Sequence, residues 1–243
     1  SQRFEMVLQP KMDLQTNSVI AAEALVRWRL EDGTYLPPSS FVDIFEKNRF
    51  CSKLDFYMLK KAILQIREWI DMGMEPVNIS VNQSKIVFYH ENYISELKSL
   101  LEEYNVSGSY ITLEVLESTV IEDIDMFNSI LTEVKKLGFS VSLDDFGSGY
   151  SSLNVLSKLQ IDELKIDRIF LHTKSEVDNQ RTKWILESII EIAKKSQILV
   201  VVEGVESKQD DLFIKSLGAD VGQGYFYGRP LSISAFNDLI ETK

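Results

Sequence analysis

Apolar residues recur along this chain with two periods, a short one typical of strands and a longer one typical of helices. The first two runs, Phe4–Leu14 and Val19–Trp28, have the pattern of strands, and the polar residues between them are typical of a hairpin turn. We therefore expect these strands to be antiparallel. Helical spacing follows at Ser40–Asn48 and Lys53–Asp71. The second of these helices carries a regular apolar stripe, which is expected to face the core.

Strand and helix patterns alternate from there to the end of the chain. The expected strands are Val77–Val81, Ile111–Glu117, Phe139–Asp144, Glu163–Ile166, Ile198–Val202 and Asp220–Tyr225. The expected helices are Glu91–Tyr104, Asp125–Leu137, Leu153–Lys158, Gln180–Lys195, Ser207–Leu217 and Ile233–Glu241. Repeated strand–helix units with short connections indicate a parallel sheet with right-handed crossovers.

The fold class that these patterns predict is α/β, a TIM-like (β/α)8 barrel with one antiparallel strand. Residues 1–243 are expected to form it as a single domain, because no linker or low-complexity tract divides the chain. An open, doubly wound sheet is the alternative. It is less favoured because no G-x-G-x-x-G turn follows the first strand.

Composition narrows the possible partners and compartment. The chain has 26 basic and 37 acidic residues and a formal net charge of -11, which disfavours binding to DNA or RNA polymers and to anionic membranes. No apolar run approaches the length of a membrane span. The single cysteine, Cys51, excludes an internal disulfide and fits a reducing, cytoplasmic compartment, either for this chain alone or for the cytoplasmic part of a larger protein.

The same composition limits the metals that the chain can bind. With two histidines and one cysteine, a zinc site built from these residue types is poorly supplied. Carboxylates are abundant, so magnesium, manganese or calcium is favoured if a metal is bound.

The stretch at residues 140–152 reads SVSLDDFGSGYSS and joins a short strand to a glycine-broken loop. Asp144 and Asp145 are adjacent, so both carboxylates can reach one site only if Asp145 is already leaving the strand. Gly147 and Gly149 supply the backbone freedom for that turn. Two adjacent acids suggest a hard metal ion between them. An acidic surface turn is the alternative.

Polar or ionisable residues stand at the carboxyl end of nearly every expected strand. They are Glu23, Asn82, Glu114 with Glu117, Asp144 with Asp145, Lys165 with Asp167, Glu203, and Gln223. In a parallel barrel these ends meet at one rim, where such enzymes place their chemistry. Taken singly, each residue could be a strand-edge charge, a turn residue or a salt-bridge partner. Their coincidence across the strands favours one polar site.

Oxygen ligands of this kind suit octahedral hard cations. Two metal ions that share a carboxylate can activate water and stabilise the leaving oxygen of a phosphodiester. A lysine and a free glutamate near that water could orient and deprotonate it. The chemistry implied is hydrolysis of a phosphate ester.

Seven segments carry a resemblance to a known family. After Gln9-Pro10 they read, in order, EALVRW, SVNQS, LEVLES, LDDFGSGYSSL, ELKIDR, VEGVE and QGYFYGRP. In this set and order they resemble the EAL domains, phosphodiesterases that hydrolyse cyclic di-GMP to the linear dinucleotide 5'-pGpG. So many motifs in family order are far more specific than one short match. The resemblance implies a TIM-like barrel with one antiparallel strand, in agreement with the strand pattern.

The resemblance also implies roles for individual residues. The ligands of a first metal ion would be Glu23, Asn82, Glu114 and Asp144, and those of a second would be Asp144 and Asp145. Lys165 would contact the nucleophilic water, and Glu203 would be the general base or a base-side metal ligand. The residues around the substrate would be Gln9, Arg27, Asp167, Glu206 and Gln223. Glu117 would hold the loop after Asp145 in its working shape, with Gly147 and Gly149 as the pliable part.

Cofactors and partners follow from the same resemblance. The cofactor would be Mg²⁺ or Mn²⁺, as two ions, and Ca²⁺ would bind but inhibit because its looser geometry positions water poorly. The partners would be cyclic di-GMP, a second copy in a homodimer, and an upstream sensory or GGDEF-type domain.

Two other functions remain open. A degenerate EAL domain would bind cyclic di-GMP or a protein partner without turnover, but it would be expected to lack one or more ligand carboxylates. A barrel aldolase with Lys165 as a Schiff-base lysine would need no metal. The many carboxylates around the expected rim disfavour that aldolase.

Overall fold

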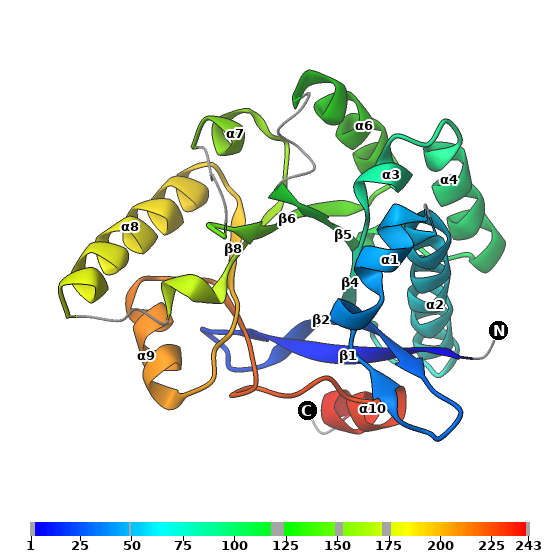
Figure 1. The fold of residues 1–243 in the computed structure, drawn as a ribbon, viewed down its shortest axis with the longest axis horizontal. Coiled ribbons are helices and arrows are strands. Elements are labelled where there is room, and N and C mark those ends of the chain that lie inside the picture. Colours follow the sequence, from blue (N-terminus) through cyan, green and yellow to red (C-terminus); the bar gives the residue numbers. More distant parts are fainter. Residues whose placement is uncertain (1–2, 49, 118–123, 149–152, 172–175, 242–243) are drawn as a thin grey trace.

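The computed structural model describes residues 3–48, 50–117, 124–148, 153–171 and 176–241. In these residues the strands form one sheet in the order β1-β9-β8-β7-β6-β5-β4-β2-β3, and an additional β1–β2 pairing closes it into a barrel with β3 outside the ring (Figure 1). The strands are β1 (Phe4–Asp13), β2 (Val19–Arg29), β3 (Tyr35–Leu36), β4 (Asn78–Asn82), β5 (Ile111–Leu116), β6 (Ser140–Phe146), β7 (Glu163–Ile166), β8 (Leu199–Val202) and β9 (Val221–Gln223). The barrel predicted from the strand and helix alternation is confirmed.

Within the ring, β1 runs against its neighbours. It pairs with β2 in a register that sets Gln9 opposite Glu23, and with β9 in a register that sets Lys11 opposite Gln223. The other neighbours in the ring are parallel. The predicted single antiparallel strand is therefore β1, and the carboxyl ends of the parallel strands share one rim.

The helices lie outside the ring of strands (Figure 1). They are α1 (Val42–Lys47), α2 (Cys51–Asp71), α3 (Lys85–Phe88), α4 (Tyr93–Tyr104), α6 (Ile124–Lys136), α7 (Leu153–Lys158), α8 (Glu176–Lys195), α9 (Lys208–Ser216) and α10 (Ile233–Glu241), with short 3-10 turns at Pro38–Ser40, Gly108–Tyr110 and Arg168–Phe170. The predicted helices are present, and α8 begins earlier than predicted, at Glu176. None of the helices in the described residues combines the length and apolar character needed to cross a membrane.

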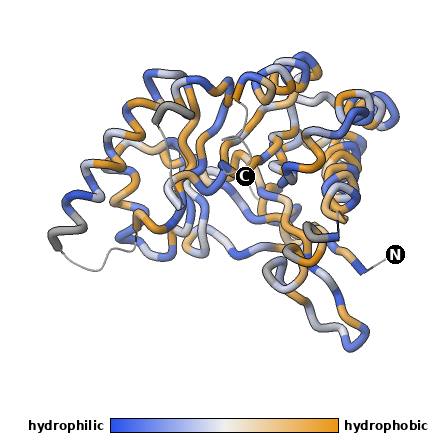
Figure 2. Tube along the Cα trace, turned by 45° about the horizontal axis from the view of Figure 1, so that its top comes forward, coloured by the Kyte–Doolittle hydropathy of each residue, from blue (hydrophilic) through white to orange (hydrophobic). Residues whose placement is uncertain are grey.

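The apolar core lies between the strands and the helices that cover them, and hydrophobic and hydrophilic stretches alternate along those helices (Figure 2). On α2, the side chains of Leu59, Ile63 and Ile66 are completely buried, as its helical stripe predicts. Each contributes about 1.5–3 kcal/mol relative to an exposed side chain. Trp69 on the same helix donates a hydrogen bond to Oδ1 of Asn237 on α10, at 2.8 Å. Packing of this kind holds the helices against the barrel.

The interior of the barrel, by contrast, is polar. Successive side chains of a strand point to opposite faces, and the interior positions carry buried polar or charged residues. Among them are Gln9, Lys11, Ser80, Thr112, Glu114, Ser142, Asp144, Glu163 and Lys165. The side chain of Lys11 on β1 points into the barrel, because its Nζ contacts Ser80 on β4, Glu114 on β5 and Glu163 on β7. Buried charges are tolerated when they are paired in this way.

Candidate active site

A polar cavity of about 390 Å³ opens among the predicted site residues at the carboxyl ends of the strands. Its lining residues are Gln9, Glu23, Asp145, Asp167, Arg168, Glu203, Gly204, Glu206, Gln223, Gly224 and Tyr225. The remaining predicted metal and catalytic residues, Asn82, Glu114, Asp144 and Lys165, are joined to this lining by direct contacts. The fold therefore brings the strand-end residues together.

Lys165 is the centre of this cluster and is 1% exposed. Its Nζ lies 2.9 Å from Oε2 of Glu114, 3.0 Å from Oδ1 of Asp144, 2.9 Å from Oε1 of Glu203 and 3.5 Å from Oε2 of Glu23. One ammonium group thus faces four carboxylates from four strands or strand ends. The excess of negative charge favours binding of a further cation.

Amide side chains hold Glu23 from both sides. Asn82 donates from Nδ2 to Oε1 of Glu23 at 2.9 Å, and Gln223 donates from Nε2 to Oε2 at 2.6 Å. Hydrogen bonds to a charged acceptor are stronger than neutral ones. Glu23 is therefore fixed in orientation by β4 and β9.

The two adjacent aspartates reach one site through a bulge inside β6. Asp145 has a left-handed backbone, with φ 56°, and the pairing of β6 with β7 shifts register between Leu143 and Phe146. The departure from regular strand geometry that the sequence requires at Asp145 is present, and it lies inside β6, which continues to Phe146. The bulge re-aims the Asp145 side chain. As a result, ligand oxygens of Asp144, Asp145 and Glu203 all lie within 4.8 Å of one another.

Burial sets the proton affinity of the carboxylates near the cavity. It raises the pKa of Glu203 to about 8, against the lowering effect of Lys165. Burial also raises the pKa of Glu23 and of Asp144, again opposed by Lys165. The pKa of Asp145 is raised by burial and by the nearby charge of Asp167. At these carboxylates, burial together with the neighbouring acids outweighs the single ammonium group of Lys165.

Glu114 behaves in the opposite way. Burial alone would raise its pKa, but Lys11 and Lys165 overcome that effect and lower the pKa to about 2. Two cations in direct contact stabilise the ionised form more than burial penalises it.

A family model described as the EAL domain matches residues 1–230 of the chain. The chain belongs to the EAL domain family. The bifunctional diguanylate cyclase/cyclic di-GMP phosphodiesterase MucR of Pseudomonas aeruginosa is 33% identical over 232 residues, which cover 95% of this chain and 34% of MucR. The cyclic di-GMP phosphodiesterase PdeR of Escherichia coli is 31% identical over 229 residues, 94% of this chain and 34% of PdeR. This EAL domain thus spans about a third of the length of these curated relatives.

Solved structures share the fold of this EAL domain. The PaMucR phosphodiesterase in complex with c-di-GMP has a TM-score of 0.88 and 31% sequence identity, covering 97% of this chain and 94% of that chain. The EAL enzyme Bd1971 in its cAMP- and cyclic-di-GMP-bound form has a TM-score of 0.90 and 29% identity, covering 98% of this chain and 65% of that chain.

The donor set of this EAL domain fits a hard divalent cation. The carboxylates of Asp144, Asp145 and Glu203 converge, and carboxylate and amide oxygens are the ligands that such cations prefer. The Oε1 atom of Gln223 is a second indication of a bound cation, because it is buried and has no hydrogen-bond partner within the described part of the chain. Buried polar atoms without partners are rare and often mark an ion or water position.

Four of the five residues predicted around the substrate line the cavity. Gln9 and Gln223 line the cavity, and Gln9 donates to the carbonyl of Gly228. Asp167 and Glu206 also line it, and each takes part in a hydrogen bond that involves a backbone N–H group. The Asp167 side chain accepts from the N–H of Ile169, and the N–H of Glu206 donates to Asp210.

Arg27 is the exception, since it does not line the cavity. Its guanidinium donates to the carbonyl of Val26 at 2.9 Å. Burial lowers the pKa of Arg27, and the charges of Tyr225 and Glu23 oppose that shift. Arg27 therefore lies within electrostatic range of the cavity lining, and its contact with substrate stays a prediction.

The loop-positioning residues are partly described. Glu117 is buried directly after β5. Gly147 has φ 100°, and a Cβ added there would clash with the ring of Phe170, so both its backbone and its packing require glycine. Gly149 lies outside the described residues. The hold of Glu117 on this loop stays a prediction.

Several residues of the site were missed from the sequence. Arg168, Gly204, Gly224 and Tyr225 line the cavity but were not singled out. Arg168, Gly204 and Gly224 each directly follow a residue that was, and Tyr225 stands two positions after Gln223, so proximity in the sequence is the signal that could have found them. Lys11 was missed as well, although alternation from Gln9 places it on the same face of β1.

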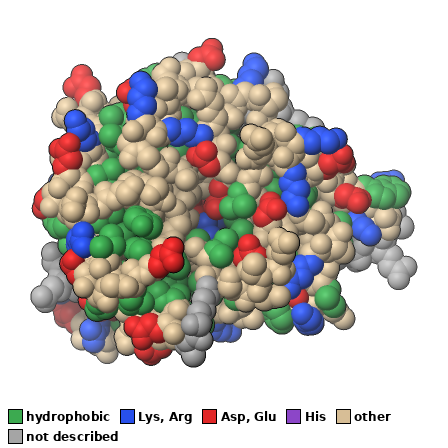
Figure 3. All heavy atoms as spheres, turned by 180° about the vertical axis from the view of Figure 1, so that it is seen from behind, with side chains coloured by type: hydrophobic (Ala, Val, Ile, Leu, Met, Phe, Trp, Pro, Cys, Tyr) green, Lys and Arg blue, Asp and Glu red, His purple; other side chains and the backbone are tan. Residues whose placement is uncertain are grey.

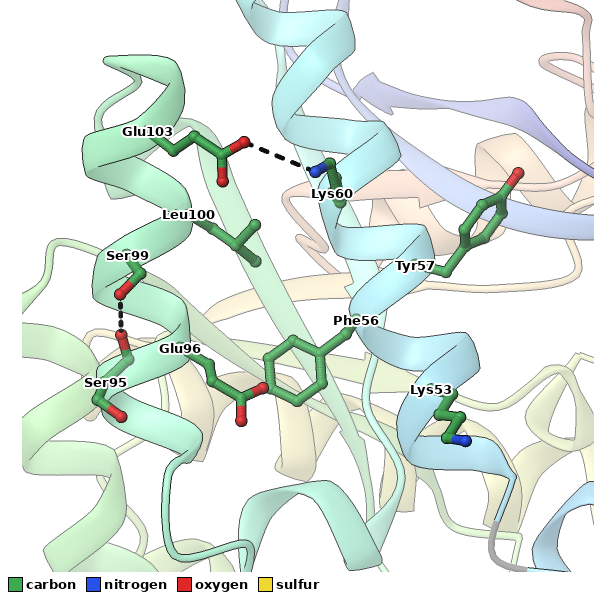
Figure 4. A pocket seen from close by; sticks show the side chains of 9 residues that line it. All are labelled: Lys53, Phe56, Tyr57, Lys60, Ser95, Glu96, Ser99, Leu100 and Glu103. Carbon is green, nitrogen blue, oxygen red and sulfur yellow. Dashed lines mark hydrogen bonds and ion pairs between the residues drawn. The ribbon is translucent and has the colours of Figure 1, made fainter. Parts of the chain in front are cut away.

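A second cavity, of about 420 Å³, lies between α2 and α4 (Figure 4). Glu103 faces Lys60 across it, with 3.7 Å between the charged atoms. It has no converging acids of the kind found at the rim. On the molecular face in Figure 3, acidic and basic side chains are interspersed, so the charge of the described residues there is not gathered into one patch. The rim cavity is therefore the candidate active site.

Proposed function

We propose that this EAL domain hydrolyses one phosphodiester bond of cyclic di-GMP to give linear 5'-pGpG in a metal-dependent reaction, lowering the level of this second messenger. The observation that carries the proposal is the convergence of four carboxylates on Lys165 beside the aspartate pair. The names of MucR and PdeR, and the c-di-GMP complex of the PaMucR phosphodiesterase, support the choice of substrate.

The metal ligands would be the rim residues predicted from the sequence. Glu23, Asn82, Glu114 and Asp144 would hold one Mg²⁺ or Mn²⁺, and Asp144 and Asp145 would hold a second. Bound ions of this kind supply a nucleophilic water at neutral pH and stabilise charge on the leaving oxygen.

The chain's own residues would handle the proton and the substrate. Glu203 would take a proton from the attacking water as the water oxygen bonds to phosphorus. The bond from phosphorus to O3' would break, and O3' would take up a proton to become the 3'-hydroxyl. Burial raises the pKa of Glu203 to about 8 in the metal-free chain, which makes its carboxylate a stronger proton acceptor than an ordinary glutamate. Lys165, 2.9 Å from Oε1 of Glu203, would orient that base and the water.

Polar side chains around the cavity would bind the dinucleotide. Arg27 suits a phosphate because its fork of N–H donors can bind two oxygens. Gln9, Asp167, Glu206 and Gln223 would contact other polar groups of the substrate. These contacts would place the scissile phosphate beside Lys165 and Glu203.

Product analysis tests the proposal. The chain is incubated with cyclic di-GMP and Mg²⁺, Mn²⁺ or Ca²⁺ in turn, and products are identified by chromatography and mass spectrometry. We expect 5'-pGpG with Mg²⁺ or Mn²⁺ and little with Ca²⁺. Tight binding of cyclic di-GMP by calorimetry together with zero product would instead identify a binding domain.

We further propose that this EAL domain follows a sensory or GGDEF-type domain, forms a homodimer and is cytoplasmic. The name of MucR, which combines a cyclase with a phosphodiesterase, supports an upstream GGDEF-type or sensory domain. The homodimer is checked by light scattering of the chain, and the cytoplasmic location by fractionation of the source cells.

A further inference from the structure

Lys11 is a buried lysine that none of the proposed catalytic roles uses. It lies on β1, inside the barrel, and is 1% exposed. Its Nζ donates to Oγ of Ser80 at 2.7 Å, to Oε1 of Glu114 at 2.9 Å and to Oε1 of Glu163 at 2.8 Å. An ammonium group has three donors, so Lys11 is fully satisfied and its position is set from three strands.

The two carboxylate oxygens of Glu114 contact two different lysines. Oε1 accepts from Lys11, and Oε2 accepts from Lys165 at 2.9 Å. Lys165 also contacts Glu203 of the cavity lining, whereas Lys11 contacts Glu163, which is not part of that lining. Only Oε2 of Glu114 is therefore turned toward the proposed metal ligands.

The contact with Glu163 prevents Lys11 from moving together with Glu114 toward the rim. Both are interior residues, and Glu163 precedes Lys165 by two positions on the same face of β7. If Lys11 moved with Glu114, it would leave Glu163 buried without its charge partner. Loss of one partner from a buried pair is strongly unfavourable.

We propose that Lys11 is a positioning residue that restrains Glu114 to one metal-facing oxygen and so favours a small octahedral cation over Ca²⁺. The inference rests on the proposed function, since it assigns a preference to the same metal site. Mg²⁺ accepts single carboxylate oxygens in near-ideal octahedral geometry, whereas Ca²⁺ takes more ligands and readily binds both oxygens of a carboxylate. Partners of metal ligands commonly tune affinity in this manner.

The test compares metal affinities, without substrate, in two variants. Lys11→Met with Glu163→Gln frees Oε1 of Glu114 and leaves the net charge of the interior unchanged. Glu163→Gln alone keeps the Lys11–Glu114 contact and is the matched control. Calorimetry gives the dissociation constants for Mg²⁺ and Ca²⁺, and circular dichroism confirms the fold of each variant.

We expect the Mg²⁺ preference of the double variant, the ratio of the Ca²⁺ to the Mg²⁺ dissociation constant, to fall about tenfold or more. The control keeps the Lys11–Glu114 contact but loses the charge that holds Lys11 in place, so its ratio should fall by less than that of the double variant. An unchanged ratio in the folded double variant would overturn the inference, whether or not both affinities fall together. If the wild-type chain binds neither cation, the metal requirement of the proposed function fails instead.

A wild-type measurement covers the case in which the double variant does not fold. In a crystal structure of the Mg²⁺-bound chain, Glu114 should bind through Oε2 alone while Lys11 keeps Oε1. Bidentate binding by Glu114, or a broken Lys11 contact, would contradict the proposed restraint.

Discussion

Two lysines inside the same barrel have different surroundings. Lys11 contacts two carboxylates and a hydroxyl, and each of its donors has one acceptor. Lys165 contacts four carboxylates within 3.5 Å. Burial is the same for both, at 1% exposure, so the difference lies in the balance of charge.

The comparison separates a supporting cluster from a reactive one. Around Lys11 the positive and negative groups satisfy one another, which restrains the chain and leaves little to gain from a ligand. Around Lys165 the acids outnumber the cation, and burial raises the pKa of Glu203 to about 8. Perturbed groups beside a cavity are typical of functional sites. Glu114 belongs to both clusters and connects them.

The largest expected effect is on turnover and concerns Glu203. Glu203→Gln should lower kcat by roughly 10²–10⁴-fold, because the amide cannot accept the proton of the attacking water. The fold and most of the affinity for cyclic di-GMP should be retained, as measured by circular dichroism and calorimetry. Glu187→Gln, an exposed position on α8, is the control and should keep wild-type rates. A Glu203→Gln variant with near-normal kcat would remove Glu203 from the mechanism.

The second prediction compares the two lysines directly. Lys11→Met and Lys165→Met should each lower the free energy of unfolding by about 3–5 kcal/mol in metal-free buffer, since each leaves buried carboxylates without a partner. Mg²⁺ should stabilise Lys165→Met more than it stabilises the wild type, because the cation can replace the lost charge at the rim. Chemical denaturation with and without Mg²⁺ measures both effects.

Lys11→Met should show less extra stabilisation by Mg²⁺ than Lys165→Met, because only one of its two carboxylate partners, Glu114, is a proposed metal ligand, and Glu163 does not line the rim cavity. If Mg²⁺ raised the free energy of unfolding equally in the two lysine variants, the surroundings of Lys11 and Lys165 would not differ in charge balance as described.

The third prediction uses the raised pKa of Glu203. A carboxyl whose folded-state pKa is raised stabilises the fold below its unfolded pKa, and this contribution is lost as the pH rises through the folded value. Without metal, the wild type should therefore lose on the order of 2–4 kcal/mol relative to Glu203→Gln between about pH 4.5 and pH 8. Urea titrations at several pH values in metal-free buffer provide the comparison. Parallel pH profiles for the two proteins would contradict the shift.

The smallest effect tests the backbone beside the aspartate pair. Gly147→Ala should cost about 1–3 kcal/mol, because alanine is strained at φ 100° and its Cβ meets Phe170. Gly33→Ala is the matched control, since Gly33 has φ 85° but open space around it. Thermal unfolding should show the larger loss at Gly147. Equal losses at the two glycines would assign the whole cost to the backbone.

Local pattern in the sequence was enough for most of the fold. Strand patterns in the sequence predict the strands of the ring, because successive side chains of a strand point to opposite faces of the sheet. The apolar stripe of α2 predicts the buried face of that helix. The short elements were missed, since β3 and α3 contain two and four residues and hold too little of a period to detect. The strand ends also identified the acids that meet at the rim, since the ends of parallel strands in a barrel converge.

Tertiary structure decided which of those acids share a cation and which side chain supports them. Lys11 and Glu163 are 152 positions apart, and closure of the sheet between β1 and β2 brings them into contact. The bulge that turns Asp145 toward Glu203 likewise depends on the pairing of β6 with β7. Local pattern was enough for the longer elements, their inward faces and the family. Which charges meet depended on register and on reach across the ring, which no local pattern contains.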